Sequence, residues 1–196
     1  MLQTIILENL SFQKVDLIFE KRDIGNVFQF YQTHTLSETL TRARYTQLKK
    51  LFSQNDESIL PLPLGESLFQ LKKANDMRYK LFLNPHGDEL FCRFRIPKSI
   101  LSESCGVYCY FSNNELVYIG RSKDPFTKRV NLGYGVIHPK NCFLDGQSTN
   151  CHLNSLINQL SNVEFYVHPI DNLAEISETE KHLINKFNPI WNIQKC

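Results

Sequence analysis

The most constraining feature of the chain is a pair of β-rich runs in its second half, separated by a short polar turn. Gly106–Phe111 alternates and is aromatic, Leu116–Gly120 follows it, and residues 112–114 (Ser-Asn-Asn) lie between them. Alternation with period two, and asparagines that tolerate a left-handed backbone, predict a β-hairpin. With a three-residue loop, Tyr108 would lie opposite Tyr118, and both rings would share the face that points away from the core.

The segments after the hairpin predict a small α+β domain. Apolar spacing and capping residues indicate helices over Pro125–Leu132 (with Asp124 as N-cap), Thr149–Leu160 and Ser177–Phe187, and a strand over Val163–Val167. The order β-β-α-α-β-α predicts a small three-stranded antiparallel-type sheet flanked by helices.

The first hundred residues form a separate N-terminal α+β region in this interpretation, and the remaining residues 101–196 form the second domain. The expected elements are strands over Thr4–Leu7 and Val15–Phe19, helices over Ser37–Phe52 and Ser67–Ala74, and a hairpin of Tyr79–Leu83 with Leu90–Ile96. This half contains no recognisable motif, and a recognition or oligomerisation role is expected for it.

Composition limits the class of protein. Of the 196 residues, 42% are hydrophobic and 21% are charged, which favours a packed globular protein over a disordered one. No apolar run approaches the roughly 20 residues of a membrane span, and the first ten residues lack the features of a secretory signal. These observations predict a cytoplasmic protein without a membrane partner.

The chain has six cysteines but no CxxC pair. A zinc site would have to combine Cys105, Cys109, Cys142, Cys151 or His152, whose spacings are not those of the usual zinc ligands. Reduced, partly buried thiols are the favoured interpretation.

Basic residues are concentrated locally although the net charge is only +2. Residues 121–140 contain five lysines and arginines but a single acid, Asp124. Residues 42–50 contain four basic residues and no acid. Such stretches are typical of surfaces that follow a phosphate backbone and also of ordinary solvated helix faces, and for residues 42–50 both interpretations stay open.

Three segments in order resemble the GIY-YIG nuclease family. Gly106-Val107-Tyr108 and Tyr118-Ile119-Gly120 resemble its two signature tripeptides. The stretch YIGRSKDPFTKRV resembles the corresponding segment in the nuclease subunit of bacterial excision repair, and EKHLINKFNPIWN resembles the segment that closes the family's domain. The resemblance covers about Cys105 to Asn192 and leaves the first hundred residues unexplained.

The resemblance implies a phosphodiester hydrolase with a defined set of catalytic residues. Tyr108 would act as general base or relay the water's proton to the shell of the metal ion, Tyr118 would hold the water or phosphate, Arg129 would bind a phosphate oxygen, and Glu180 would be the single protein ligand of Mg²⁺ (or Mn²⁺). These assignments agree with the chemistry, because Mg²⁺ prefers oxygen ligands and often takes only one or two carboxylates, and a guanidinium binds phosphate as a fixed fork.

The chain departs from the family pattern at a fourth catalytic position. The family places a histidine or tyrosine one helical turn beyond the arginine, and here that position is Gly133. Tyr134, one residue later, and His138 are the two candidates for the role.

Further residues are expected to contact DNA. These are Arg121, Lys123, Lys128, His138, Gln147, Asn150 and Asn192. Basic side chains bind phosphate, and amides can hydrogen-bond to base edges.

The favoured function is a sequence-specific, restriction-type DNA endonuclease that acts on duplex DNA, with residues 1–100 and 133–154 building the recognition surface. A symmetric homodimer is one arrangement that suits such an enzyme. The alternatives are a structure- or single-strand-specific nuclease of DNA repair or mobile elements, and a catalytically silent DNA-binding module.

Overall fold

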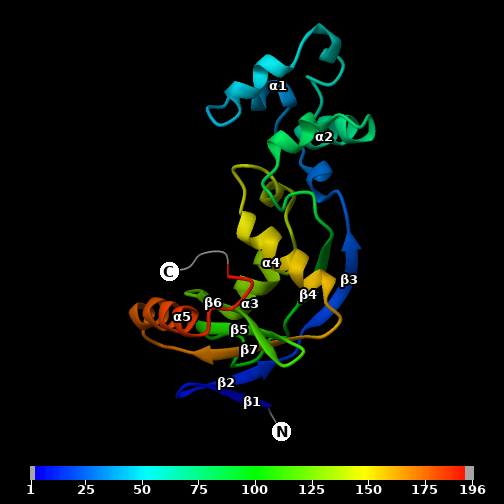
Figure 1. Ribbon diagram of the computed structural model, residues 1–196. Coiled ribbons are helices and arrows are strands. Elements are labelled where there is room, and N and C mark those ends of the chain that lie inside the picture. The colour runs from blue at the N-terminus through cyan, green and yellow to red at the C-terminus, as the bar shows by residue number, and fades with distance from the viewer. Residues whose placement is uncertain (1–2, 193–196) are drawn as a thin grey trace. The chain divides into compact units, whose positions relative to one another are not determined.

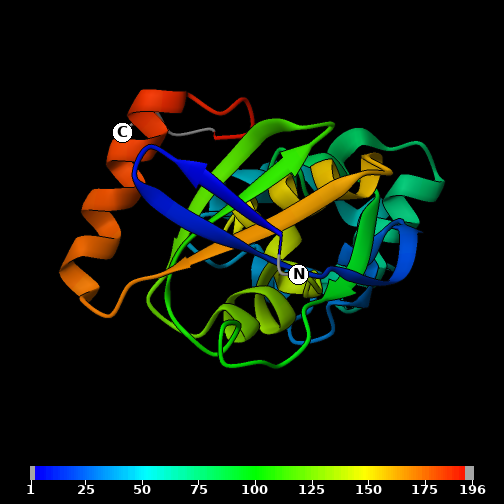
Figure 2. The same cartoon turned by 90° about the horizontal axis from the view of Figure 1, so that it is seen from below.

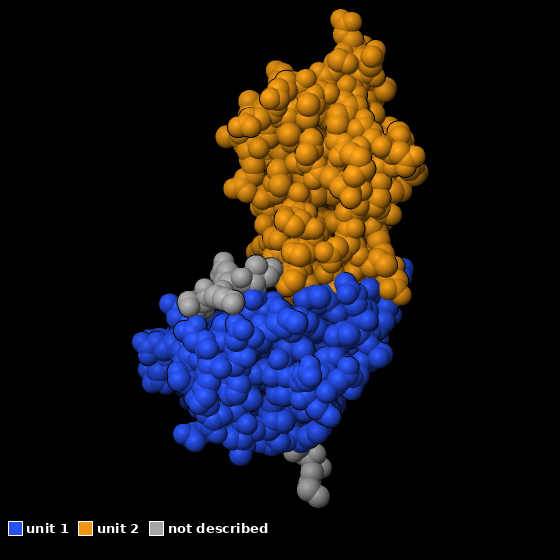
Figure 3. Space-filling view, viewed as in Figure 1, with its two compact units in different colours: residues 1–22, 92–136, 156–196 blue, residues 23–91, 137–155 orange. Residues whose placement is uncertain are grey.

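The structure is a computed structural model that describes residues 3–192, and it contains two compact units. Within the described residues, unit 1 consists of 3–22, 92–136 and 156–192, and unit 2 consists of 23–91 and 137–155 (Figure 3). The units interleave along the chain. The predicted boundary near residue 100 therefore lies inside the second segment of unit 1.

Unit 1 is built on a five-stranded sheet with the strand order β1-β2-β7-β5-β6, in which the neighbours are antiparallel (Figures 1 and 2). The strands are β1 (Thr4–Leu7), β2 (Leu10–Val15), β5 (Gly106–Ser112), β6 (Glu115–Ser122) and β7 (Val163–Pro169). The predicted α+β class is confirmed. The predicted three-stranded sheet is wrong, because β2 pairs with the free edge of β7 and brings β1 with it.

One face of this sheet packs against the long helix α5 (Leu173–Phe187). The core contains Val107, Cys109 and Ile119 from the hairpin and apolar side chains of α5, including Ile176 and Leu183. The helix begins four residues earlier than predicted because Asn172 caps it, accepting a hydrogen bond from the Ala174 N–H at 3.0 Å.

The β5–β6 hairpin differs from the prediction in its loop. The turn has two residues, Asn113 and Asn114, both at positive φ (51° and 67°), so Ser112 lies opposite Glu115. The register also shifts at a bulge between Tyr110 and Phe111. As a result Tyr118 lies opposite Tyr110 instead of the predicted Tyr108.

Unit 2 is mainly helical and has its own apolar core, which includes Phe28, Leu68, Phe82 and Phe143. Its elements are α1 (Leu36–Thr39), α2 (Leu64–Lys73), the first part of α4 (Ser148–Gln159) and 3-10 helices over Val27–Phe30, Thr46–Leu51, Gln54–Asp56, Met77–Phe82 and Pro139–Cys142. The helices predicted over 67–74 and 149–160 are confirmed as α2 and α4.

The long helix predicted over Ser37–Phe52 is wrong, because α1 ends after one turn. The N-cap is Thr35, whose hydroxyl accepts from the Glu38 N–H at 3.1 Å, not Ser37. Beyond it, the Thr39, Thr41 and Thr46 hydroxyls each donate to a carbonyl three or four residues back. Such bonds compete with regular helical hydrogen bonds and favour the turns observed here.

Two further strand predictions fail for tertiary reasons. The run Val15–Phe19 is the end of β2 and the start of β3 (Ile18–Ile24). The segment 79–83 belongs to a 3-10 helix that Asp76 caps, so β4 (Phe91–Arg95) pairs with β3 in a two-stranded sheet instead of forming the predicted hairpin. No helix among residues 3–192 is long and apolar enough to cross a membrane.

Candidate active site

The second face of the unit 1 sheet carries a cluster of aromatic rings from β5 and β6. Tyr108, Tyr110 and Tyr118 share this face, and the Tyr108 and Tyr118 ring centroids are 6.1 Å apart. The rings therefore lie side by side as predicted, although the register that brings them together is different. Tyr108 and Tyr110 are fully buried, whereas Tyr118 is half-buried.

Gly120 allows this close packing. A Cβ atom at position 120 would lie 2.6 Å from Cζ of Tyr108 and 2.7 Å from Cε1 of Tyr118. Both rings therefore pack directly on the backbone of β6. Glycine is required at position 106 for a different reason. The φ of +147° would strain any other residue, and a Cβ there would lie 2.2 Å from the His168 carbonyl oxygen.

Arg129 reaches the tyrosine cluster from the short helix α3 (Phe126–Arg129). Its Nε donates to the Tyr108 hydroxyl at 3.4 Å, and its Cζ lies 5.3 Å from the Tyr134 ring centroid. Its interaction with Tyr108 raises the pKa of Arg129, so the side chain carries a fixed positive charge. The N-cap of α3 is Pro125, not the predicted Asp124, because the carbonyl groups of Ser104 and Ser102 accept the first N–H groups of the helix.

Tyr134 joins the cluster through a wide turn over Val130–Tyr134, which is kinked at Gly133, where the backbone angles are not helical (φ −104°, ψ −113°). The Gly135 N–H donates to the Val130 carbonyl at 2.8 Å, a bond between residues five apart. The wider turn brings Tyr134, one residue beyond the family's usual position, against Tyr108 with ring centroids 6.2 Å apart. The other candidate, His138, belongs to unit 2, where its Nδ1 accepts the Lys140 N–H at 3.2 Å.

Tyr110 is a residue of this cluster that sequence reasoning did not select. Its hydroxyl and that of Tyr134 are 2.9 Å apart and hydrogen-bonded. Both side chains are fully buried, and burial raises the pKa of both phenols well above the ordinary value. The strand alternation that places Tyr108 on this face also places Tyr110 there, so the signal was present in the sequence.

Glu180 lies on α5, which packs on the opposite face of the sheet from the tyrosine cluster, and its side chain reaches the edge strand β6. Its side chain is 15% exposed, and its Oε2 lies 3.0 Å from Nη1 of Arg121 on β6. Burial raises the pKa of Glu180, and the charges of Arg121 and Arg129 oppose that effect. Burial also raises the pKa of Tyr118, to which the negative charge of Glu180 contributes. The contact that holds the Glu180 side chain is therefore its ion pair with Arg121 of β6.

Asn192 binds the backbone of β6 next to Tyr118. Its Oδ1 accepts the Ile119 N–H at 3.0 Å, and its Nδ2 donates to the Ile119 carbonyl at 2.8 Å. The neighbouring Trp191 N–H donates to the Val117 carbonyl at 2.9 Å. Both polar atoms of the asparagine are therefore engaged by the backbone of β6, which fixes the segment after α5 beside Tyr118.

The other predicted DNA-contacting residues fall into two groups. In unit 1, Lys123 and Lys128 are exposed, and Lys128 pairs with Asp124 at 2.8 Å. In unit 2, Gln147 is exposed, whereas Asn150 is buried and donates to the Gln147 side chain at 2.6 Å. Asn150 therefore acts within the start of α4 in this structure and is not presented to solvent.

The site fits a cation that takes few protein ligands. Among residues 3–192 no group of three or more histidine, cysteine, aspartate or glutamate side chains could hold a metal ion, and the five described cysteines are free thiols. Cys196 lies outside the described residues. Glu180 nevertheless has suitable chemistry for Mg²⁺, because it is a largely buried carboxylate that requires a neighbouring positive charge.

A segment of the chain is similar to Endonuclease II of Enterobacteria phage T4. The two sequences are 33% identical over 99 residues, which represent 45% of this chain and 71% of the phage protein. No family model and no solved structure matches the chain. The identity and coverage show that the chain belongs to a nuclease family, the one that includes this phage endonuclease.

Proposed function

We propose that the protein is a metal-dependent DNA endonuclease of the GIY-YIG type. The observation that carries the proposal is an arrangement of side chains at β6: Arg129 Nε lies 3.4 Å from the Tyr108 hydroxyl, the Tyr108 and Tyr118 rings are 6.1 Å apart, and Glu180 pairs with Arg121 of the same strand at 3.0 Å. A carboxylate for a cation and a guanidinium for a phosphate, beside a half-buried phenol, are the groups that phosphodiester hydrolysis requires. The similarity to Endonuclease II supports the same reaction class.

Each side chain has a distinct task in this proposal. Arg129 binds a non-bridging phosphate oxygen and stabilises the charge that develops on it. Glu180 would hold Mg²⁺ or Mn²⁺, and the cation would supply charge stabilisation to the phosphate and the leaving oxygen. Tyr118, the half-buried phenol, orients the attacking water or the phosphate.

Tyr108 is the proposed general base. Its hydroxyl accepts a hydrogen bond from Arg129 Nε at 3.4 Å, so the phenol oxygen is held beside the guanidinium that would bind the phosphate. Tyr134 fills the fourth position as a positioning residue, because its buried hydroxyl is bonded to Tyr110 while its ring supports Arg129. Asn192 acts by fixing the end of α5 to β6.

The proposed substrate is duplex DNA cut at specific sequences, as in a restriction-type enzyme. Arg121, Lys123 and Lys128 of unit 1 would contact phosphates, and unit 2 with its polar segment 137–155, including His138 and Gln147, would supply recognition. A homodimer would cut both strands of a symmetric site.

Digestion of supercoiled plasmid DNA with Mg²⁺ tests this function. We expect discrete fragments with Mg²⁺ and intact plasmid with EDTA. Cutting confined to single-stranded, flap or bubble substrates would replace sequence specificity with structure specificity. Binding without any cutting, across Mg²⁺ and Mn²⁺, would contradict the nuclease and favour a DNA-binding module.

A further inference from the structure

The ion pair between Arg121 and Glu180 is asymmetric. The carboxylate is 15% exposed and the guanidinium is 39% exposed, with Nη1 and Oε2 3.0 Å apart. Arg121 directly follows Gly120 on the edge strand β6, whereas Glu180 comes from α5. The carboxylate is therefore held in the site, while the guanidinium has a solvent-facing side from which it can leave.

Arg121 is the counter-charge in direct contact with Glu180. Their side chains are 3.0 Å apart, and the carboxylate is the more buried of the two. A carboxylate removed from water needs a counter-charge. In the structure Arg121 supplies that charge, and a divalent cation is the other species that could supply it.

We propose that Arg121 neutralises Glu180 in the free protein and transfers to a DNA phosphate when the substrate binds, which releases the carboxylate for the metal ion. The inference rests on the proposed function and adds regulation to it, because metal and DNA then bind in a coupled manner. Arg121 thereby restrains metal binding in the absence of DNA.

Physical chemistry supports an exchange of partners. A partly exposed ion pair is weak, so that replacing one anion by another costs little. Guanidinium groups bind phosphate oxygens with the same fork geometry that they offer to carboxylates. A duplex phosphate is thus a comparable partner for Arg121, and the carboxylate that it leaves regains a counter-charge by binding the cation.

The first measurement is the affinity of DNA-free protein for Mn²⁺, followed by the loss of the electron paramagnetic resonance signal of free Mn²⁺. We expect Arg121→Gln to bind Mn²⁺ about threefold to tenfold more tightly than wild type, and Glu180→Gln to lose this binding. Arg121→Lys should give an intermediate affinity, because it keeps the charge but loses the fork.

Arg95→Gln is the matched control. Arg95 is also an exposed arginine of unit 1 paired with a glutamate, with Nε 3.1 Å from Oε1 of Glu20. This substitution should leave Mn²⁺ affinity unchanged. Thermal unfolding of every variant establishes that the protein is folded.

The second measurement is the affinity for a fluorescent DNA duplex in EDTA. Arg121→Gln should weaken binding, whereas Glu180→Gln should tighten it by releasing Arg121 for the phosphates. The gain from Glu180→Gln should disappear in the double variant Arg121→Gln/Glu180→Gln, since Arg121 is the group through which it acts.

Two results would overturn the inference. One is a Mn²⁺ affinity of Arg121→Gln equal to or weaker than that of wild type, and the other is a gain in DNA affinity from Glu180→Gln that persists without Arg121. A different result would show that the proposed function itself is wrong, namely DNA cleavage at the wild-type rate by Glu180→Gln.

Discussion

At the scale of single residues, the site depends on how closely Tyr108 and Tyr118 pack on β6. Gly120 leaves room for both rings, because a Cβ there would lie within 2.7 Å of each of them. The glycine of the tripeptide Tyr118-Ile119-Gly120 thus has a steric reason in this chain. The glycine belongs to the site although it has no functional group.

We therefore expect Gly120→Ala to lower the free energy of unfolding by about 1–3 kcal/mol through overpacking. Because the new methyl group displaces Tyr108, DNA cleavage should fall as well. Urea unfolding measures the loss of stability. In a Tyr108→Leu background the same substitution should cost less, and an equal cost in both backgrounds would contradict the role of the Tyr108 ring.

Tyr134→Phe separates a supporting role of this residue from direct proton transfer. The Tyr134 hydroxyl is buried and bonded to Tyr110, so its removal should lower stability by about 1 kcal/mol and leave most of the cleavage rate. Loss of cleavage as complete as that in Tyr134→Ala would show that the hydroxyl itself takes part in the reaction.

The sequence predicted Tyr108, Tyr118, Arg129 and Glu180 as site residues. The structure brings Tyr108, Tyr118 and Arg129 together, and it places Glu180 beside β6. The sequence did not reveal that Arg121 pairs with Glu180 or that Asn192 bonds to Ile119. Both contacts join segments about sixty or more residues apart, and no local pattern encodes such partners.

At the scale of elements, hydrophobic periodicity predicted the strands and helices that pack one apolar face against a core. The strands β5, β6 and β7 and the helices α4 and α5 all appear where alternation or helical spacing placed them. The failures have local or tertiary causes. Near the end of α1, threonine hydroxyls donate to backbone carbonyl groups, which disfavours a longer helix. The strand β4 pairs with β3, a partner about seventy residues away along the chain.

The attachment of the segment after α5 to β6 gives a prediction at this scale. Asn192→Ala removes two hydrogen bonds to Ile119 and should lower stability by about 1–3 kcal/mol, because it leaves the Ile119 backbone groups without these partners. Cleavage should slow as Glu180 and Tyr118 lose their relative positions. DNA affinity in EDTA should stay unchanged, whereas a residue that contacts DNA would reduce it.

At the scale of the whole molecule, the chain combines a compact unit that contains the candidate active site with a second unit assembled from two segments. The sequence suggested two regions, but a single division near residue 100 did not anticipate that β1 and β2 join the sheet of unit 1. Strands from distant segments pair through backbone groups, which carry little sequence information. Unit 2 has its own core, and the role that we propose for it is DNA recognition.

The basic segment of unit 2 tests that role. Lys49 and Lys50 are exposed, so the double variant Lys49→Gln/Lys50→Gln should weaken DNA binding and reduce the slope of log affinity against log salt concentration by about 2. Its Mn²⁺ affinity should equal that of wild type. An unchanged salt slope, as expected for the exposed control Lys80→Gln, would leave these lysines as an ordinary solvated surface.

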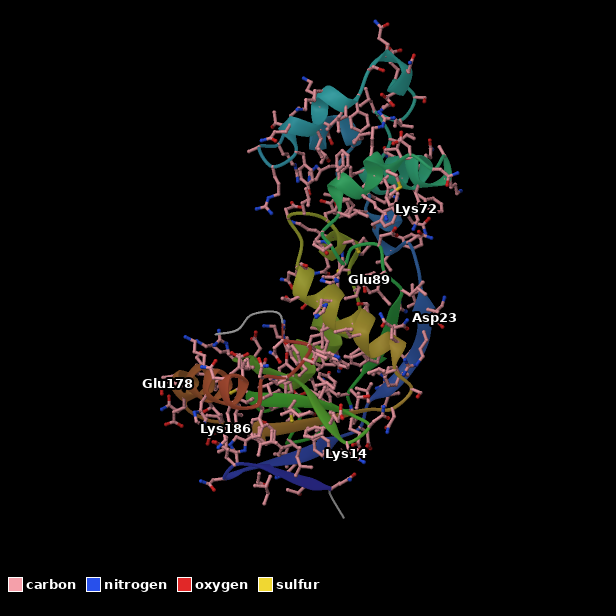
Figure 4. All side chains as sticks on the ribbon, in the orientation of Figure 1. Lys14, Asp23, Lys72, Glu89, Glu178 and Lys186 are labelled. Atoms are coloured by element: carbon pink, nitrogen blue, oxygen red, sulfur yellow. The ribbon has the colours of Figure 1, made fainter. Side chains whose placement is uncertain are left out.

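The single-turnover rate of DNA cleavage in Mg²⁺ by Glu180→Gln is the most direct test of the proposed active site. Glu178 provides the matched control, because it lies on the same helix with its side chain exposed (Figure 4). We predict a loss of at least about 100-fold for Glu180→Gln and a rate within about twofold of wild type for Glu178→Gln. Equal rates for the two variants would contradict the assignment of Glu180 and, with it, the proposed active site.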